Sequence, residues 1–425
     1  MKPFLEAVLE RFPFDATVAE AARRAADRLA TEARARTEAR VHANVLQAFL
    51  AEGIAESDLA GVFGYGYDDA ARGRYESLLC RIFGTERALA RLSLVSGTHA
   101  IVATLEACLP AAGRLISATG TPYDTLRNAI VSAPHSLVAR GIRYEEIALR
   151  EDGALDLGAL ERACSTPFDV VFVQRSRGYA SRRSLSAKDC GAVADIAHAA
   201  APGSFVLVDN CYGELVEASE PTHHGADAVM GSLIKNLGGG LAPGGAYVAG
   251  SAEVVERVAA RHYAPGLGTA LGPMLGFGRA LVQGLFYAPL IVGECLAGLD
   301  FAAALCLELG EHVDPQPGAE RFDIVQAVRL GSPERLKAFA HGLQRAMPLN
   351  ARFAPEPGPV PGYRDAVIMS GGAFVPGATI ELSCDAPLRP PFEVYLQGGI
   401  SRRHVILGIL FAAESLRKES NCSRP

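Results

Sequence analysis

The chain lacks the features that mark nucleic-acid-binding and membrane proteins. Its 41 Lys and Arg are dispersed and are outnumbered by 47 Asp and Glu, for a formal net charge of -6, so we expect no nucleic-acid partner. No run of about 18 apolar residues occurs, which predicts that no segment spans a membrane. The opening MKPFLEAVLERF has acidic residues where a signal peptide needs a positive end and an apolar core.

Paired cysteines are also missing. The nine cysteines occur singly, with no CxxC pair and no alternation with histidines, which is typical of a reduced, cytoplasmic protein. His223 and His224 lie near Asp227, but adjacent side chains project apart in most backbones, and no third ligand stands at a supporting spacing. We therefore predict no metal site and a cytoplasmic location.

The composition that remains is that of a large globular body. Of 425 residues, 49% are hydrophobic and 21% are charged, and a chain of this length should divide into more than one domain. Residues 1–60 are predicted to be an N-terminal helical segment, with one long amphipathic helix from Thr17 to Glu52 that serves packing or subunit contact. Its apolar residues recur three and four positions apart, as in Val18, Ala21, Ala22, Ala25 and Leu29.

Two further domains are expected. Over residues 61–260, short apolar runs such as RLISAT, DVVFVQ and SFVLVDN alternate with helical patterns, which predicts a large α/β domain around a mostly parallel sheet. Residues 261–425 contain helices punctuated by Gly and Pro, a Pro-rich stretch and the run ATIELSCD. They are predicted to form a smaller C-terminal α+β domain. No internal repeat is evident.

A turn of small residues precedes a predicted helix. Ser96, Gly97, Thr98 and His99 follow the apolar run RLSLV and open the helical run AIVATLEACL. Backbone amides at such a helix start can bind an anion such as a phosphate; alternatively, Ser96 or Thr98 simply caps the helix. His99 could lie against a bound ring or belong to the cap.

Two more candidates stand at the ends of predicted strands. Tyr123, after the run RLISAT, can stack on an aromatic cofactor and offer its hydroxyl to a reacting group, or it can be a structural tyrosine in a turn. Asp209 ends the run SFVLVD. A carboxylate there can pair with the nitrogen of a pyridine ring, or it can cap a helix.

Lys235 favours the pyridine-binding alternative for Asp209. It lies about one βαβ unit further along, after the apolar run AVMGSLI and before a glycine loop, and this is how pyridoxal phosphate (PLP) is usually held. Lys235 would bind the cofactor covalently and act as a base at the substrate Cα, with a pKa lowered by burial and by the cationic ring. Ser232, shortly before it, could hydrogen-bond the phosphate or simply end the strand.

The segments SGTHA, PYDTL, VDNCYGE and SLIKN, in this order, resemble the PLP-dependent methionine γ-lyase family. The resemblance is to the aluminium-resistance branch, which is related to the cystathionine γ-lyase family, and it runs from about Phe63 to Gly399. It implies the aspartate-aminotransferase-like fold of PLP-dependent transferases, fold type I. It also implies cofactor contacts for the motif residues, with the phosphate at Gly97 and Thr98, the ring under Tyr123, the pyridine nitrogen at Asp209 and the covalent link at Lys235.

The same resemblance implies subunits that share active sites. In related γ-lyases, a tyrosine and an arginine of a neighbouring subunit complete the phosphate site. Tyr65, Tyr67 and Arg72 lie in the segment that would do so here. We therefore expect a homodimer at least, and a tetramer as the fuller assembly.

Two further contacts follow from the resemblance. Arg389 in APLRPP is the candidate to bind the substrate carboxylate. Near the O3′ of the cofactor, Gln174, Arg175 and Arg177 compete for one place, and Arg177 is assigned to the cofactor site.

The activity implied is elimination from a small amino-acid substrate. Lys235 removes the Cα proton, and sulfur or another leaving group departs from Cβ or Cγ. A 2-oxo acid or a related unsaturated product then forms with ammonia. Tyr123 is the candidate to protonate a leaving thiolate. The alternatives are an aminotransferase with the same Lys235 and Asp209, γ-elimination of a halide in specialised amino-acid metabolism, and a binding protein without turnover, against which the intact Asp209 and Lys235 argue.

Overall fold

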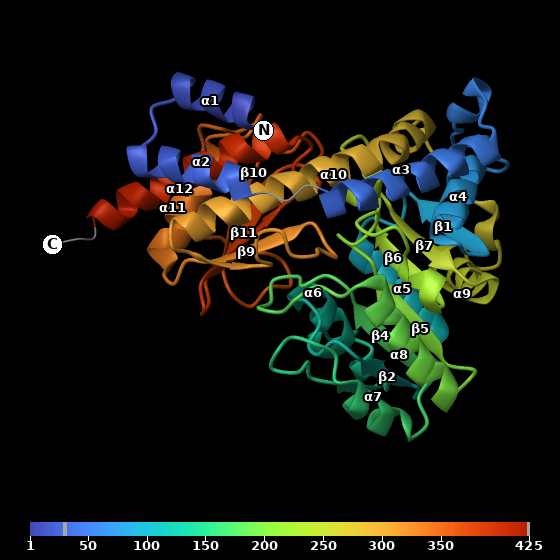
Figure 1. Ribbon diagram of the computed structural model, residues 1–425. Coiled ribbons are helices and arrows are strands. Elements are labelled where there is room, and N and C mark those ends of the chain that lie inside the picture. The colour runs from blue at the N-terminus through green and yellow to red at the C-terminus, as the bar shows by residue number, and fades with distance from the viewer. Residues whose placement is uncertain (29–31, 423–425) are drawn as a thin grey trace. The chain divides into compact units, whose positions relative to one another are not determined.

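The computed structural model describes residues 1–28 and 32–422, which fall into two compact units (Figure 1). Unit 1 consists of residues 1–36, 179–181 and 290–425, and unit 2 of residues 37–178 and 182–289. The boundaries placed near 60/61 and 260/261 from the sequence stay predictions, because compactness alone does not define which segments fold as a domain.

Unit 2 is built around a seven-stranded sheet with the order β1-β7-β6-β5-β4-β2-β3. The strands are β1 (Arg87–Arg91), β2 (Arg114–Ser117), β3 (Arg143–Glu146), β4 (Val170–Gln174), β5 (Phe205–Asp209), β6 (Ala228–Ser232) and β7 (Ala246–Gly250). Neighbours run parallel except that β7 is antiparallel to both β1 and β6. The predicted mostly parallel sheet is confirmed. β4, β6 and β7 are buried along their whole length, which is why they read as unbroken apolar runs.

Capping residues set where most helices of unit 2 begin. The helices are α3 (Glu32–Glu52, mostly in this unit), α4 (Ala70–Phe83), α5 (Gly97–Cys108), α6 (Asp124–Arg127), α7 (Leu157–Cys164), α8 (Ala187–Ala200) and α9 (Ala252–Val258). Short 3-10 or π segments cover 56–59, 128–132, 138–140, 221–224, 236–238, 259–263 and 268–270. Side-chain oxygens of Asp69, Ser96, Asp156, Ser186 and Ser251 accept a first-turn amide in α4, α5, α7, α8 and α9, respectively.

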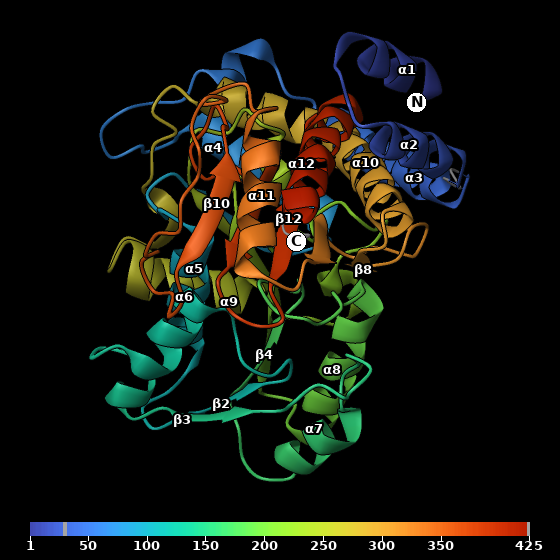
Figure 2. The ribbon, with the colours of Figure 1, turned by 90° about the vertical axis from the view of Figure 1, so that its left-hand side faces the viewer.

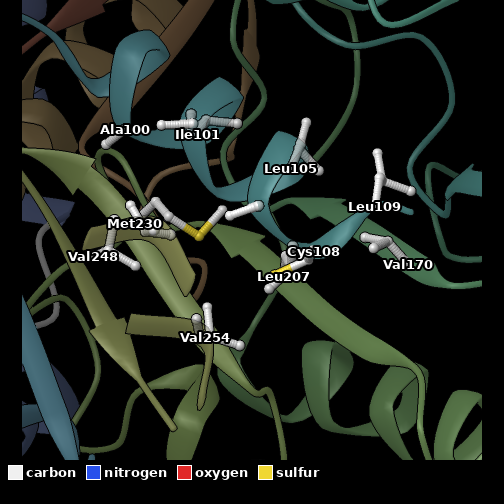
Figure 3. Close-up of a cluster of buried hydrophobic side chains, with 14 of the residues drawn as sticks. Ala100, Ile101, Leu105, Cys108, Leu109, Val170, Leu207, Met230, Val248 and Val254 are labelled. Carbon is white, nitrogen blue, oxygen red and sulfur yellow. The ribbon is translucent and has the colours of Figure 1, made fainter. Parts of the chain in front are cut away.

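One apolar cluster fixes α5 against the sheet. Figure 3 shows Ala100, Ile101 and Leu105 of α5 facing Met230 and Val248 of the strands, and all five are buried. Fully burying one Leu or Met side chain contributes about 1.5–3 kcal/mol. This packing holds the start of α5 beside the end of β6.

Unit 1 contains a five-stranded antiparallel sheet with the order β10-β11-β12-β9-β8. Its strands are β8 (His312–Asp314), β9 (Val325–Arg329), β10 (Val367–Gly371), β11 (Ser383–Pro387) and β12 (Glu393–Gln397). Its helices are α1 (Lys2–Arg11), α2 (Ala16–Arg28), α11 (Pro333–Gln344) and α12 (Arg402–Cys422), with the second part of α10 (Gly278–Glu308). Figure 2 shows α11 and α12 side by side. The single long helix predicted over 17–52 corresponds to two helices, α2 and α3, and Leu29 lies outside the described residues.

By length and composition alone, α10 is apolar enough to cross a membrane, with a mean hydropathy of 1.9 over its most apolar 18 residues. The sequence of α10 is not an unbroken apolar run, because Pro289, Glu294 and Asp300 interrupt it, but these few residues lower its mean hydropathy only slightly. Of that window, 83% is buried within the protein. Asp300 is paired with Arg321 at 2.7 Å, which is how a core helix satisfies a buried charge.

Candidate functional site

The predicted site residues of unit 2 meet at the ends of β5 and β6. β5 ends at Asp209, β6 ends at Ser232, and α5 begins at Gly97. A Cβ placed on Gly97 would lie 3.0 Å from the Cys211 Sγ and 3.3 Å from the Ser232 nitrogen. A larger residue at position 97 would therefore crowd both neighbours. The carboxyl ends of parallel strands are where α/β proteins bind ligands.

Of the two roles that the sequence left open for this helix start, the structure shows the cap and is compatible with the anion site. Ser96 is the cap, since its Oγ accepts the His99 amide at 3.1 Å. The Gly97 and Thr98 amides have no acceptor within a helix that begins there, so they can bind an anion. The exposed His99 ring accepts a hydrogen bond from the Val95 amide at 3.3 Å through Nδ1.

Tyr123 is held at both its backbone and its hydroxyl. Its amide donates to Gln174 Oε1 at 2.9 Å, and its hydroxyl lies 2.8 Å from Thr98 Oγ1. Gln174 ends β4 in register with Asp209, so the tyrosine is fixed between three elements of the site. Burial and the nearby Asp209 raise the pKa of Tyr123 well above its ordinary value. The phenol therefore keeps its proton and can serve as a donor.

Asp209 is a buried carboxylate, 4% exposed. Its Oδ1 accepts the Cys211 amide at 3.1 Å, within a turn that follows the strand. Burial raises the pKa of Asp209, and Lys235 opposes this rise. A carboxylate so buried needs a cation or several donors to keep its charge.

The Lys235 amine lies 3.9 Å from the centre of the Tyr212 ring. Burial alone lowers the pKa of Lys235, but Cys211, Tyr212 and Asp209 outweigh it and raise the pKa well above its ordinary value. The lowered pKa expected from the sequence assumed the positive charge of a bound cofactor beside the amine, so it stays a prediction for the PLP-bound protein.

Tyr212 and Asn236, which were not predicted as site residues, lie next to Asp209 and Lys235 and support the Lys235 loop. Tyr212 follows Asp209 closely, and Asn236 follows Lys235 directly. The Asn236 side-chain amide donates to the carbonyls of Tyr212 at 3.1 Å and Glu214 at 2.8 Å. Tyr212 lies inside the motif VDNCYGE and Asn236 inside SLIKN, and this placement is the only feature of the sequence that links them to the site.

Gln174, Arg175 and Arg177, at and just after the end of β4, differ in the residues that they contact. Arg175 is buried, and its guanidinium contacts Asn210 Oδ1 at 2.6 Å and Glu220 at 3.1 Å. These contacts make it a structural residue. Gln174 positions Tyr123, as described. Arg177 is buried as well, and its assignment to the cofactor stays a prediction.

Tyr65 and Tyr67 lie on the surface of unit 2, 72% and 54% exposed, with ring centres 6.1 Å apart. Arg72 is buried behind them and donates to the carbonyls of Gly66 at 2.6 Å and Gly272 at 2.9 Å. Arg72 therefore supports this segment, while the two tyrosines are accessible to another molecule.

Arg389 belongs to unit 1. Its guanidinium lies 3.3 Å from Asp365 Oδ2 and donates to the Tyr179 carbonyl at 2.9 Å. Its role toward a substrate carboxylate stays a prediction.

No group of three potential metal ligands occurs in residues 1–28 and 32–422. His223 Nδ1 accepts the Glu220 amide at 3.0 Å, and His224 Nε2 lies 2.9 Å from Ser219 Oγ. Both rings are therefore engaged in local hydrogen bonds.

The residues present fit PLP. The buried Asp209 suits a protonated pyridine nitrogen, and the Lys235 amine suits an aldehyde. The helix-start amides of Gly97 and Thr98, with the Ser232 hydroxyl, suit a phosphate.

Comparison with known proteins agrees with this geometry. The methionine gamma-lyase family matches residues 17–417. The chain is 39% identical to the uncharacterised protein YnbB of Bacillus subtilis (strain 168) over 379 residues, which are 88% of this chain and 90% of YnbB.

Two solved structures cover nearly the whole chain. One is a Clostridium acetobutylicum protein assigned provisionally as a cystathionine β-lyase involved in aluminium resistance, with 36% identity and a TM-score of 0.92 over 96% of this chain and 98% of that one. The other is a carbon–sulfur lyase involved in aluminium resistance from Clostridium novyi NT, with 35% identity and a TM-score of 0.91 over 96% and 98%. The fold is fold type I, aspartate-aminotransferase-like, as predicted. The chain therefore belongs to the methionine γ-lyase family.

Proposed function

We propose that this chain is a PLP-dependent lyase. It eliminates sulfur or another leaving group from Cβ or Cγ of a small amino acid and yields a 2-oxo acid, or a related unsaturated product, and ammonia. The observation that carries the proposal is the meeting of Asp209, Lys235 and the start of α5 at the ends of β5 and β6. Membership of a PLP-dependent family, and a similar solved structure named as a carbon–sulfur lyase, support it.

The residues divide the work by position. PLP, when bound, supplies a ring that withdraws electrons from the substrate Cα. Lys235 would hold it covalently, and Asp209 would pair with its pyridine nitrogen. The free Nζ of Lys235 accepts the Cα proton and, for departure from Cγ, a Cβ proton. Tyr123 gives its phenolic proton to a leaving thiolate, and Thr98 orients that hydroxyl at 2.8 Å.

We propose a homodimer as the smallest active assembly, with a tetramer as the fuller one. Unit 2 exposes an aromatic patch, defined as Val62, Phe63, Tyr65, Tyr67, Leu275 and Phe277. Two backbone hydrogen bonds join its halves, from Leu275 to Val62 at 3.1 Å and from Gly272 to Tyr65 at 2.9 Å. A connected apolar surface of this kind marks a contact with another molecule. A partner seated here would receive Tyr65 and Tyr67.

We propose a cytoplasmic location, because the eight cysteines from Cys80 to Cys384 are free thiols. Arg389 is proposed to bind the substrate carboxylate after leaving Asp365.

The decisive experiment incubates the purified, PLP-loaded protein with amino acids that carry sulfur or a halogen at Cβ or Cγ. Thiol, ammonia and 2-oxo acid are assayed from each substrate, with Lys235→Ala as the control. Thiol and ammonia released from one substrate support the proposal. Transfer of the amino group with no loss of the side-chain group would establish the aminotransferase instead, and halide release alone would establish the halide alternative. A protein that binds no PLP would refute the lyase proposal and both of these alternatives.

A further inference from the structure

We propose that Tyr212 is the docking place of the Lys235 side chain: its ring binds the ammonium group whenever the amine is not joined to the cofactor. Tyr212 is thus a positioning residue that acts through Lys235. Its meaning for catalysis rests on the proposed lyase function, while the contact itself does not.

The geometry is that of a cation–π contact. Lys235 Nζ lies 3.9 Å from the centre of the Tyr212 ring, well inside the distance of about 6 Å at which such contacts attract. Both residues are only partly exposed, and shielding from water strengthens the attraction. The ring attracts an ammonium group but not a neutral amine, so the contact selects the protonated lysine.

The backbone of Tyr212 is strained in order to place this ring. Its φ is 71°, in the left-handed region that a side chain other than glycine seldom occupies. Asn236 holds the strained residue by donating to its carbonyl at 3.1 Å, and the Gly213 amide closes the turn on Asn210 at 2.9 Å. A glycine would fit this turn without strain. We infer that the contact of the Tyr212 ring with Lys235 offsets the cost of the strained backbone.

Without PLP, the Asp209 carboxylate adds to the effect of the ring on Lys235; once PLP is bound, the other groups that face Lys235 do not replace the ring. They are Asp209, Cys211, Tyr123 and Glu214. Burial raises the pKa of the Cys211 thiol, the Tyr123 phenol and the Glu214 carboxyl, so all three are mainly neutral near pH 7. Cys211 and Tyr123 therefore attract the Lys235 ammonium group as charges only at the higher pH where they ionise. Once PLP is bound, the Asp209 carboxylate would pair with the pyridine nitrogen. The Tyr212 ring then remains as the partner for the cation.

The consequence for catalysis is a preference in proton transfer. When Lys235 takes the Cα proton, the bonding pair stays with the substrate and Nζ becomes an ammonium group. No other atom is oxidised or reduced. Because the ring stabilises that ammonium group, it favours removal of the proton over its return.

The test measures the titration of Lys235 in the full chain without PLP. Trace acetic anhydride labels the amine at a series of pH values, and peptide mass spectrometry quantifies the label at Lys235. In Tyr212→Leu, the pKa of Lys235 should fall by about one unit, which makes the free amine about tenfold more abundant at a given pH. Tyr212→Phe keeps the ring and should titrate like wild type. Tyr287→Leu, at an unrelated half-exposed tyrosine, is the matched control.

Two outcomes would overturn the inference: an unchanged titration in Tyr212→Leu, or an equal shift in Tyr212→Phe, which would assign the effect to the hydroxyl. If Tyr212→Leu does not fold, a series of increasingly fluorinated phenylalanines at position 212 replaces it. The pKa of Lys235 should then fall in steps with fluorination, and a flat series refutes the contact. The titration needs neither cofactor nor turnover, so it tests this inference even in a protein without lyase activity. If the protein is an active lyase and the series is flat, the Tyr212 inference is refuted while the proposed function stands.

Discussion

Replacing Gly97 by alanine should weaken PLP binding by displacing the start of α5. The added Cβ would lie 3.0 Å from Cys211 Sγ and 3.3 Å from the Ser232 backbone nitrogen. Both contacts are closer than ordinary van der Waals separation, and the second involves backbone, so the helix start must move. The free protein can accept that movement, whereas the bound phosphate needs the Gly97 and Thr98 amides in place.

The size of the effect follows from packing energetics. Forcing a methyl group into a filled site costs about 1–3 kcal/mol. If the bound state bears this whole cost, the dissociation constant of PLP rises about 5- to 150-fold. The assay is titration of the protein with PLP, followed by the visible absorbance of the bound cofactor, with thermal unfolding to show that the variant is folded.

The matched control is Gly73→Ala near the start of α4, where a Cβ would meet no atom within 4 Å. Its affinity for PLP should equal that of wild type. Adding Cys211→Ala to Gly97→Ala removes the nearest obstructing atom and should restore part of the lost affinity. Wild-type affinity in Gly97→Ala would refute the placement of the phosphate at this helix start.

Three further predictions concern other parts of the site. Lys235→Ala should lose the covalent cofactor, as borohydride reduction and mass spectrometry would show, whereas Asp209→Ala should keep it and react far more slowly; normal turnover in both would contradict their roles. Burial raises the pKa of Glu214 to about 8, above the value of about 4.3 in an unfolded chain, so between these values the folded protein binds the extra proton and stability falls as pH rises. Glu214→Gln has no such proton, and its advantage in Tm over wild type should grow from about pH 5 to about pH 8; a constant difference would show that Glu214 is not the group responsible. Arg175→Ala leaves the Glu220 carboxylate buried without its cation and should lower the free energy of unfolding by about 3–5 kcal/mol in denaturant titrations, whereas a loss below 1 kcal/mol would mean that the pair is dispensable.

The sequence predicts the central strands of unit 2 and their end residues well, because burial on both faces leaves a direct mark. The strand expected over RLSLV is wrong, since β1 is Arg87–Arg91 and residues 92–95 form a turn, and β3, with the sequence RYEE, carries no apolar run that could reveal it. β4, β5 and β6 are apolar runs, and Asp209 and Ser232 end two of them. Lys235 follows from the same pattern, since it stands in the loop after β6.

Features that depend on contacts distant in the chain could not be predicted. Arg175 and Arg177 look alike in the sequence, and only the position of Glu220 beside Arg175 separates them. The left-handed backbone of Tyr212 is equally hidden, because left-handed turns usually carry glycine or asparagine. The helix α10 was missed as an apolar segment because isolated charges such as Asp300 are neutralised by partners elsewhere in the chain.

The antiparallel direction of β7 has a consequence for how Lys235 can move. In a crossover connection, the segment after β6 would continue through a helix to a parallel strand. Here the chain instead turns back as β7, which pairs antiparallel with β6, so that Ser232 lies opposite Ala246. The Leu233 amide extends this ladder by donating to the Gly245 carbonyl at 3.0 Å. Lys235 thus sits on a loop clamped at its base, so we expect its side-chain torsions, rather than its backbone, to carry the amine between partners. Slow hydrogen–deuterium exchange of the Leu233 amide would report that clamp.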